Sequence, residues 1–168
     1  SIGDFMFNTG ARHDTNNLHD DVNTYRLGVG YRINDNMTAI AGHNTGFRAP
    51  TLYEMYGADN FGYTGNPNLE EERSVTNEVG LVSQVKTDYL MMDSKFVVFS
   101  TKIDNMIEYG NSTYSNGTGT SSMEGWELQN KQKFDDTAIN FSVTSVHAQN
   151  SDNIELTRRP QYSAVIGV

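Results

Sequence analysis

The sequence predicts an all-β fold, an antiparallel meander of about eight strands that forms part of a transmembrane β-barrel. Segments of alternating apolar and polar residues recur along the chain, and this period of two is typical of strands with one apolar face. The connections between these segments are alternately long and short. Every second connection of an antiparallel meander lies at the same end of the sheet. The long loops therefore share one end, as they do in outer-membrane barrels.

The strand pattern recurs in segments separated by connections that are rich in glycine and polar residues. The predicted strands are residues 3–12, 22–33, 37–45, 74–85, 89–109, 123–131, 137–146 and 158–168. The predicted long loops are residues 13–21, 46–73, 110–122 and 148–156, and the short turns are residues 34–35, 86–88 and 132–136. Within the strand 89–109, four bulky residues run together at positions 96–99, which predicts a β-bulge there.

Residues 22–33 carry the clearest strand pattern. Tyr25 and Tyr31 bracket the apolar residues of one face and lie roughly 20 Å apart at about 3.3 Å per residue. Aromatic residues at both edges of an apolar band are typical of a lipid interface. The opposite faces of the predicted strands carry polar residues such as Arg26, Glu78 and Glu127. A lumen filled with water or a plug tolerates such residues, whereas a dry core does not.

The composition excludes several classes of protein. A net charge of −9 argues against a nucleic-acid partner, because phosphate binding needs a basic face. The chain has no cysteine, so no disulfide or thiolate metal site is expected. It lacks a nucleophile elbow, a zinc-protease motif and a phosphate loop, so we expect no enzyme activity. Because the chain lacks an initiating methionine and ends within a predicted strand, we expect it to be an internal piece of a larger protein.

The longest connection, residues 46–73, is the candidate functional site, because long irregular connections are usually functional. Pro50 and Pro67 fix the backbone where this loop begins and ends. Arg48 either faces a ligand or pairs with a neighbouring acid. The aromatic residues of the loop either stack on a ring-shaped ligand or pack the loop onto its neighbours. These aromatic residues are Tyr53, Tyr56, Phe61 and Tyr63.

Several motifs resemble those of TonB-dependent outer-membrane receptors of the cobalamin or siderophore receptor type. Two proline boxes carry much of the resemblance, Phe47-Arg48-Ala49-Pro50 and Asn66-Pro67-Asn68-Leu69. A glutamate-rich run and Asn77-Glu78-Val79-Gly80-Leu81 follow them. Further matches lie at residues 102–109, 124–128 and 158–162. These matches follow the order of the family over residues 45–168.

The resemblance implies a barrel of about 22 strands around a plug domain. Residues 1–168 would then be a partial barrel domain without the plug, and residues 46–73 an extracellular loop. The implied partners are outer-membrane lipid, the plug, the inner-membrane energy-transducing protein and a small-molecule nutrient, either cobalamin or a ferric siderophore. No cofactor or metal of the protein itself is implied, although such a nutrient carries cobalt or iron.

The resemblance also suggests which residues approach the ligand. The candidates are Arg48, Tyr53, Tyr56 and Tyr63. Glu78 and Arg26, on predicted wall strands, are expected to face the plug instead.

Three alternatives remain open at this stage. The first is a haem receptor of the same family; residues 51–65 lack the histidine expected between the two boxes, although tyrosine can also ligate haem iron. The second is a complete small eight-stranded outer-membrane barrel with a structural or adhesive role, and the third is a soluble eight-stranded ligand-binding barrel. Residues 13–21 contain histidine and aspartate that could hold a divalent cation, but a solvated loop is the simpler interpretation.

Overall fold

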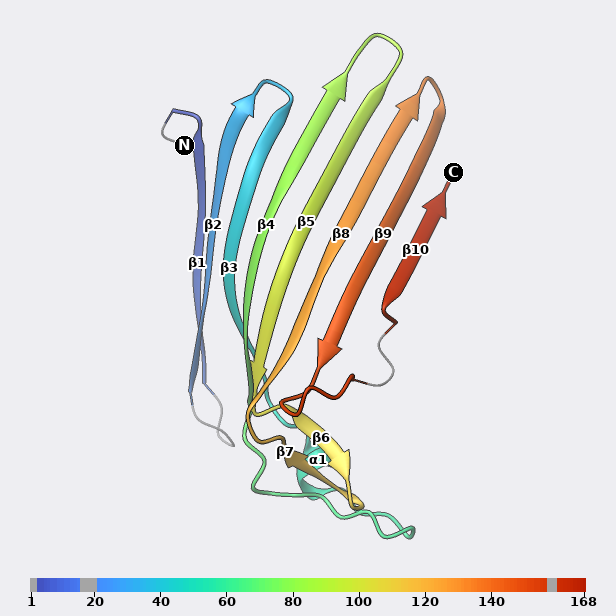
Figure 1. Ribbon diagram of the computed structural model, residues 1–168. Helices are drawn as coiled ribbons and strands as arrows, with labels where there is room; N and C mark the ends of the chain where they lie inside the picture. The colour runs from blue at the N-terminus through green and yellow to red at the C-terminus, as the bar shows by residue number, and fades with distance from the viewer. Residues whose placement is uncertain (1–2, 16–20, 157–159) are drawn as a thin grey trace.

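The computed structural model describes residues 3–15, 21–156 and 160–168. Within these residues the chain forms an eight-stranded antiparallel sheet in the order β1-β2-β3-β4-β5-β8-β9-β10 (Figure 1). The elements are β1 (Phe5–Asp14), β2 (Val22–Asn34), β3 (Met37–Arg48), α1 (Leu52–Tyr56), β4 (Glu72–Lys86), β5 (Met91–Asp104), β6 (Ile107–Gly110), β7 (Thr113–Asn116), β8 (Thr120–Phe134), β9 (Thr137–Gln149) and β10 (Tyr162–Gly167). The predicted all-β meander is therefore confirmed. The described part of the chain contains no helix long and apolar enough to span a membrane.

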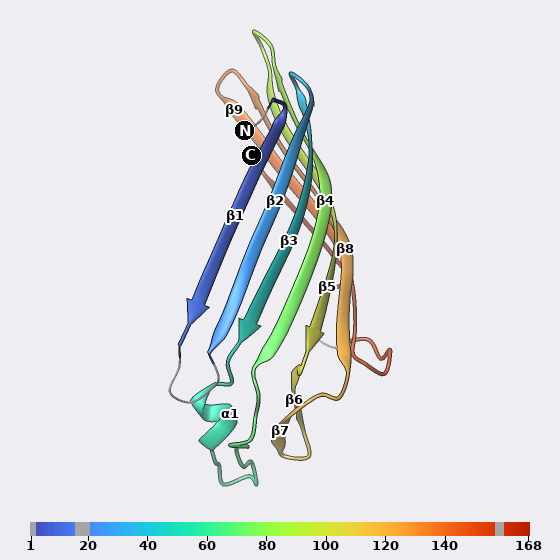
Figure 2. The same cartoon turned by 90° about the vertical axis from the view of Figure 1, so that its left-hand side faces the viewer.

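The sorting of connections by length is confirmed for those that the structure describes in full. The tight turns after β2, β4 and β8 lie together at one end of the sheet, the upper end in Figure 1. The long connections after β3 and β5, residues 49–71 and 105–119, lie together at the opposite end. Seen from the side, the sheet is curved, as expected for a section of a barrel wall (Figure 2).

One face of the sheet is apolar across neighbouring strands. The cross-strand register places Val29, Ala41, Val79, Val98 and Trp126 in one row. The Val79 and Val98 side chains remain exposed, at 60% and 46% of their accessible surface. The opposite face carries charged residues such as Glu78 and Glu127. An apolar outer face and a polar inner face are the arrangement of a membrane barrel, and we use these two names for the faces below.

The expected β-bulge at positions 96–99 is absent. The pairing of β5 with both β4 and β8 is continuous over the whole strand. Two glycines on the flanking strands explain why the bulky run fits without a bulge. A Cβ at Gly80 would lie 2.9 Å from Val97 Cγ2, and one at Gly125 would lie 2.9 Å from Phe99 Cζ. Val97 and Phe99 thus occupy space on the inner face that glycine leaves open, while their neighbours face outward.

Several predicted boundaries were wrong at the long-loop end. The strand predicted for residues 89–109 ends at Asp104, and β6 is a separate short strand. The loop predicted for residues 110–122 contains β7 and the start of β8 instead. The loop predicted for residues 46–73 is shorter, residues 49–71, and it contains α1. The last strand begins at Tyr162, and residues 158 and 159 lie outside the described residues.

Candidate ligand-binding rim

Residues 49–71 and the hairpin β6–β7 pack together at the long-loop end, and we call this unit the rim module. The chain leaves β3 through Pro50, which is buried. Thr51 then caps α1: its hydroxyl accepts a hydrogen bond from the Glu54 amide at 3.1 Å, and the Glu54 carboxylate accepts one from the Thr51 amide at 2.6 Å. This reciprocal capping box explains why so short a helix forms directly after the proline.

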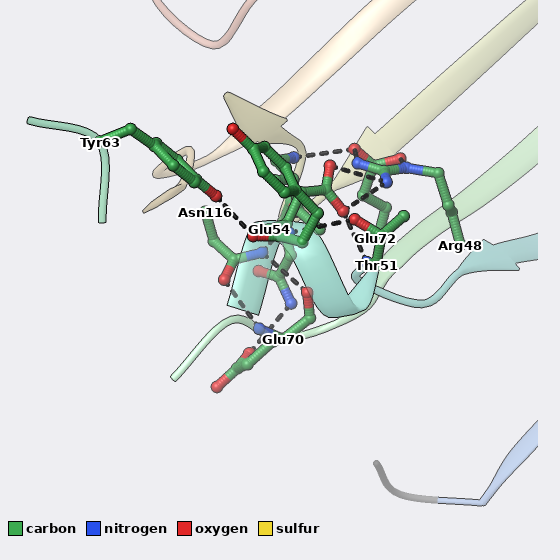
Figure 3. A network of polar contacts seen from close by, with 10 residues as sticks. Arg48, Thr51, Glu54, Tyr63, Glu70, Glu72 and Asn116 are labelled. Atoms are coloured by element: carbon green, nitrogen blue, oxygen red, sulfur yellow. Dashed lines mark hydrogen bonds and ion pairs between the residues drawn. The ribbon is translucent and has the colours of Figure 1, made fainter. Parts of the chain in front are cut away.

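An ion-pair network joins the rim module to the wall (Figure 3). The Arg48 guanidinium donates to both carboxylate oxygens of Glu72 at 2.9 Å and to those of Glu54 at 3.2 Å. Glu72 also accepts a hydrogen bond from the Ile107 amide at 2.8 Å. The carboxylates of Glu54 and Glu72 therefore connect the end of β3, the helix α1 and the hairpin. Of the two roles expected for Arg48, the structure shows pairing with neighbouring acids.

The electrostatics of this network keep Glu54 ionised. Burial raises the pKa of Glu54, but hydrogen bonds from Thr51 and the charge of Arg48 together lower it by more. The net pKa of Glu54 therefore lies below its usual value.

A small apolar core holds the rim module together. Met55, Leu69 and Ile107 are buried against one another, and Tyr114 packs on them. The loop crosses α1 at Gly65, where a Cβ would lie 2.6 Å from the backbone of Met55. Only glycine permits this approach of two backbones.

Asparagine side chains then fix the loop to the hairpin. The Asn116 amide donates to the carbonyls of Glu70 and Asn105 at 3.0 and 2.8 Å, and its oxygen accepts from the Glu70 amide at 2.8 Å. Asn66, in the second proline box, donates to the Tyr114 carbonyl at 3.0 Å. Leu69 of the same box lies in the core. Both boxes therefore supply structural contacts.

The predicted tyrosines fall into two groups. Tyr63 is 5% exposed, its hydroxyl donates to the Tyr53 carbonyl at 2.6 Å, and its ring stacks on Tyr53 with centroids 4.8 Å apart. Burial raises the pKa of Tyr63, which disfavours the phenolate form that would ligate haem iron. Tyr53 and Tyr56 are exposed, and Phe61 is 95% exposed at the tip of the loop. These three residues form the exposed aromatic surface of residues 49–71.

Sequence reasoning missed the contribution of the hairpin. Tyr109 and Tyr114 face each other across β6–β7, with centroids 5.1 Å apart, and both contact Tyr63. Tyr109 is exposed and extends the aromatic surface. The two tyrosines are cross-strand partners, and a four-residue alternation on each side of Asn111-Ser112 was the signal that could have found them.

The remaining candidates lie away from the rim. Glu78 projects from β4 onto the inner face, where a Cβ at Gly42 would lie 2.7 Å from its Oε1 atom. Arg26 is on the same face of β2 and lines the same hollow as Glu78. His13 Nε2 lies 3.9 Å from Asp21 Oδ2, but positions 16–20 of the suggested cation site lie outside the described residues.

The curved wall with an apolar outer face and the braced rim define a section of a membrane receptor barrel. The chain belongs to the TonB-dependent receptor family, because the family model described as TonB dependent receptor-like, beta-barrel, matches residues 1–168. This is a family of outer-membrane receptors and transporters rather than enzymes.

Relatives and solved structures agree with this assignment. The vitamin B12 transporter BtuB of Photobacterium profundum is 30% identical over 118 residues, which are 70% of this chain and 18% of that protein. The protein of the same name from Vibrio cholerae is 26% identical over 163 residues, 94% of this chain and 25% of that protein. The siderophore receptor PirA from Pseudomonas aeruginosa has the same fold, with a TM-score of 0.70 at 23% identity, covering 86% of this chain and 28% of that chain. The chain thus spans a quarter or less of these curated relatives.

Proposed function

We propose that this chain is a wall section of an outer-membrane receptor that captures cobalamin and passes it inward. In this proposal the long-loop end faces the outside and the rim module contacts the nutrient. The polar inner face surrounds a plug domain, whose movement is driven by the inner-membrane energy-transducing protein. The similarity to vitamin B12 transporters over 70% of the chain supports cobalamin as the cargo.

The proposal rests on an exposed aromatic surface in a segment, residues 49–71, that has no lysine or arginine to bind an anionic ligand. Tyr53 and Tyr56 present their rings to solvent on a braced support. Residues 49–71 contain four acids and no lysine or arginine, and both Glu54 and Glu72 already engage Arg48. Such a surface suits a large ring system without net negative charge, which stacks on aromatic faces. We assign Tyr53 and Tyr56 to ligand contact, and Arg48 and Tyr63 to holding them in place.

A ferric siderophore is the second candidate, because the same rings would stack on an aromatic siderophore. The acids of residues 49–71 disfavour siderophores whose iron complex is strongly anionic, because like charges repel. Haem is less favoured. The loop between the two boxes has no histidine, and the phenol of Tyr63 is buried and hydrogen-bonded.

Cobalamin binding to the full-length receptor in detergent tests the proposal. Tyr56→Ala and Tyr53→Ala should each weaken binding about fivefold, the equivalent of about 1 kcal/mol of lost stacking. Tyr89→Ala is the matched control, because Tyr89 is an exposed tyrosine in the turn between β4 and β5, at the opposite end of the wall. The Tyr89→Ala receptor should bind cobalamin with the affinity of the wild type.

A ferric hydroxamate and a ferric catecholate are titrated in parallel. Binding of the catecholate but not of cobalamin would reject the proposed cargo. Equal losses in Tyr56→Ala and Tyr89→Ala would reject the rim as the contact surface, whatever the nutrient.

A further inference from the structure

Four lysines gather on the inner face at the short-turn end of the wall. Lys86 is on β4, Lys95 on β5, and Lys131 and Lys133 on β8. The alternation of each strand places them on the side of Glu78, Val97 and Glu127, opposite the apolar outer row. We call these four residues the lysine patch.

The lysine patch extends over three neighbouring strands rather than converging on one point. Lys95 is the cross-strand partner of Gln129, so Lys131 lies one diagonal step away, about 7–8 Å between backbones. Lys133 lies a further step along β8, about 6.6 Å. Met91 on β5 is the cross-strand partner of both Lys86 on β4 and Lys133 on β8. The backbones of these two lysines are therefore two strand spacings, about 10 Å, apart.

The lysine patch has a net positive charge, because the register places a single carboxylate, that of Asp93, among its four ammonium groups in the part of the chain that the structure describes. All four are exposed, and none forms an ion pair. Asp93 is the cross-strand partner of Lys131, but its carboxylate accepts a hydrogen bond from Gln84 at 3.1 Å instead. By contrast, Arg48 and Arg73 at the other end of the wall are both paired with glutamates. In a chain of net charge −9, an unpaired cationic patch is a specific local feature.

Polar residues and a hollow adjoin the lysine patch on the inner face. Gln129, Lys131, Asn140 and Ser142 are inner-face residues among those that line a hollow between β8, β9 and β10, and Asn130 and Phe141 also border it. Further up the same face, Glu78 and Glu127 replace the lysines as the charged residues. The inner wall therefore has an excess of cations near the short turns and carries both signs of charge at mid-height, where Arg26 and Glu78 line one hollow.

We infer that the lysine patch docks a carboxylate-rich face of the polypeptide that fills the lumen of the intact receptor. This inference rests on the proposed function, because it requires a lumen-filling domain. Packing such a domain against the patch without carboxylates would bury ammonium groups unpaired, which is strongly unfavourable. The spread of the patch over three strands matches an extended protein face with several acids better than a single small anion.

Amide hydrogen exchange in the full-length receptor tests the inference. The triple variant Lys95→Glu, Lys131→Glu and Lys133→Glu should speed exchange at least tenfold in the lumen domain segment that faces the short turns. It should also raise ion leakage through the barrel in planar bilayers. The triple lysine-to-arginine variant should behave as wild type, and so should Lys102→Glu, an exposed lysine on the outer side of β5. High salt should weaken the protection of the wild type because it screens the pairs.

Heat-modified migration on gels reports whether each barrel is assembled. If the charge-reversed triple variant fails to assemble, the glutamine triple variant takes its place, with a smaller increase in exchange expected. Unchanged exchange and leakage in an assembled variant would overturn the inference. The same holds if exchange is unchanged while uptake of an anionic nutrient falls, because the lysine patch would then serve a passing ligand. A receptor without any lumen domain would instead reject the proposed function.

Discussion

Asn116→Asp isolates the side chain that ties the two parts of the rim module together, residues 49–71 and the hairpin. The substitution keeps the shape of the side chain but replaces its amide donor with an oxygen. Two hydrogen bonds are lost, to the carbonyls of Glu70 and Asn105 at 3.0 and 2.8 Å, while the one accepted from the Glu70 amide is retained. Each neutral hydrogen bond contributes about 1 kcal/mol, so the rim module should lose about 2 kcal/mol of local stability.

Hydrogen exchange of the full-length receptor measures this loss. About 2 kcal/mol corresponds to about 30-fold faster exchange in peptides that cover residues 66–72 and 105–119. Peptides from the wall strands β4 and β5 should exchange as in the wild type.

Asn111→Asp is the matched control, because it makes the same change of charge in the turn of the hairpin. The Asn111 side chain forms no hydrogen bond within the described residues, and its left-handed backbone, with φ of 53°, suits aspartate as well. If Asn116→Asp accelerates exchange less than about threefold, or no more than Asn111→Asp does, the bridge through Asn116 does not hold the rim module.

Three further predictions concern the loop, the pH response and the membrane face. Gly65→Ala should destabilise the rim module by about 1–3 kcal/mol in the same exchange assay, because the new Cβ meets the backbone of α1, whereas Gly110→Ala, with open space around it, should not. The folded pKa of Glu54 lies below its usual 4.5, so its stabilisation is present above that value and is lost as the pH falls through the folded pKa; the protection of α1, measured as exchange relative to the intrinsic rate at each pH, should fall as the pH drops below 4.5, and Glu54→Gln should remove this pH step. Val98→Arg on the outer face should lower folding stability in lipid vesicles by about 2–4 kcal/mol, whereas Gln129→Arg on the inner face should have little effect.

The wall was predictable from sequence because a strand with one apolar face has a period of two that survives any tertiary context. Residues 22–33 gave this signal without ambiguity, and β2 covers them. The bulge expected at positions 96–99 was wrong because the period of a single strand does not reveal its neighbours. Gly80 and Gly125 lie 16 or more positions away in sequence, and their effect on Val97 and Phe99 is visible only once the register is known.

The rim module was less predictable because its order comes from side chains rather than from a repeating pattern. The hairpin β6–β7 has only four residues in each strand, and its turn uses Asn111-Ser112 at φ of 53° and 62° instead of the more recognisable asparagine-glycine pair. Tyr53 and Tyr63 have the same side chain and lie in the same loop. Nothing in the sequence distinguishes the exposed ring from the buried one, because that difference depends on the hydrogen bond to the Tyr53 carbonyl.

Asp104 and Thr120 are direct cross-strand partners, so β5 and β8 are already closed beneath the hairpin that separates them in sequence. Residues 105–119 therefore leave the wall and rejoin it at the same cross-strand residue pair. The entropy of closing a loop grows slowly, by about 0.6 kcal/mol for each doubling of length. The hairpin can accordingly change in sequence and length while the wall keeps its strand register. A different hairpin grafted between Asp104 and Thr120 should leave the register of β5 and β8 intact for the same reason.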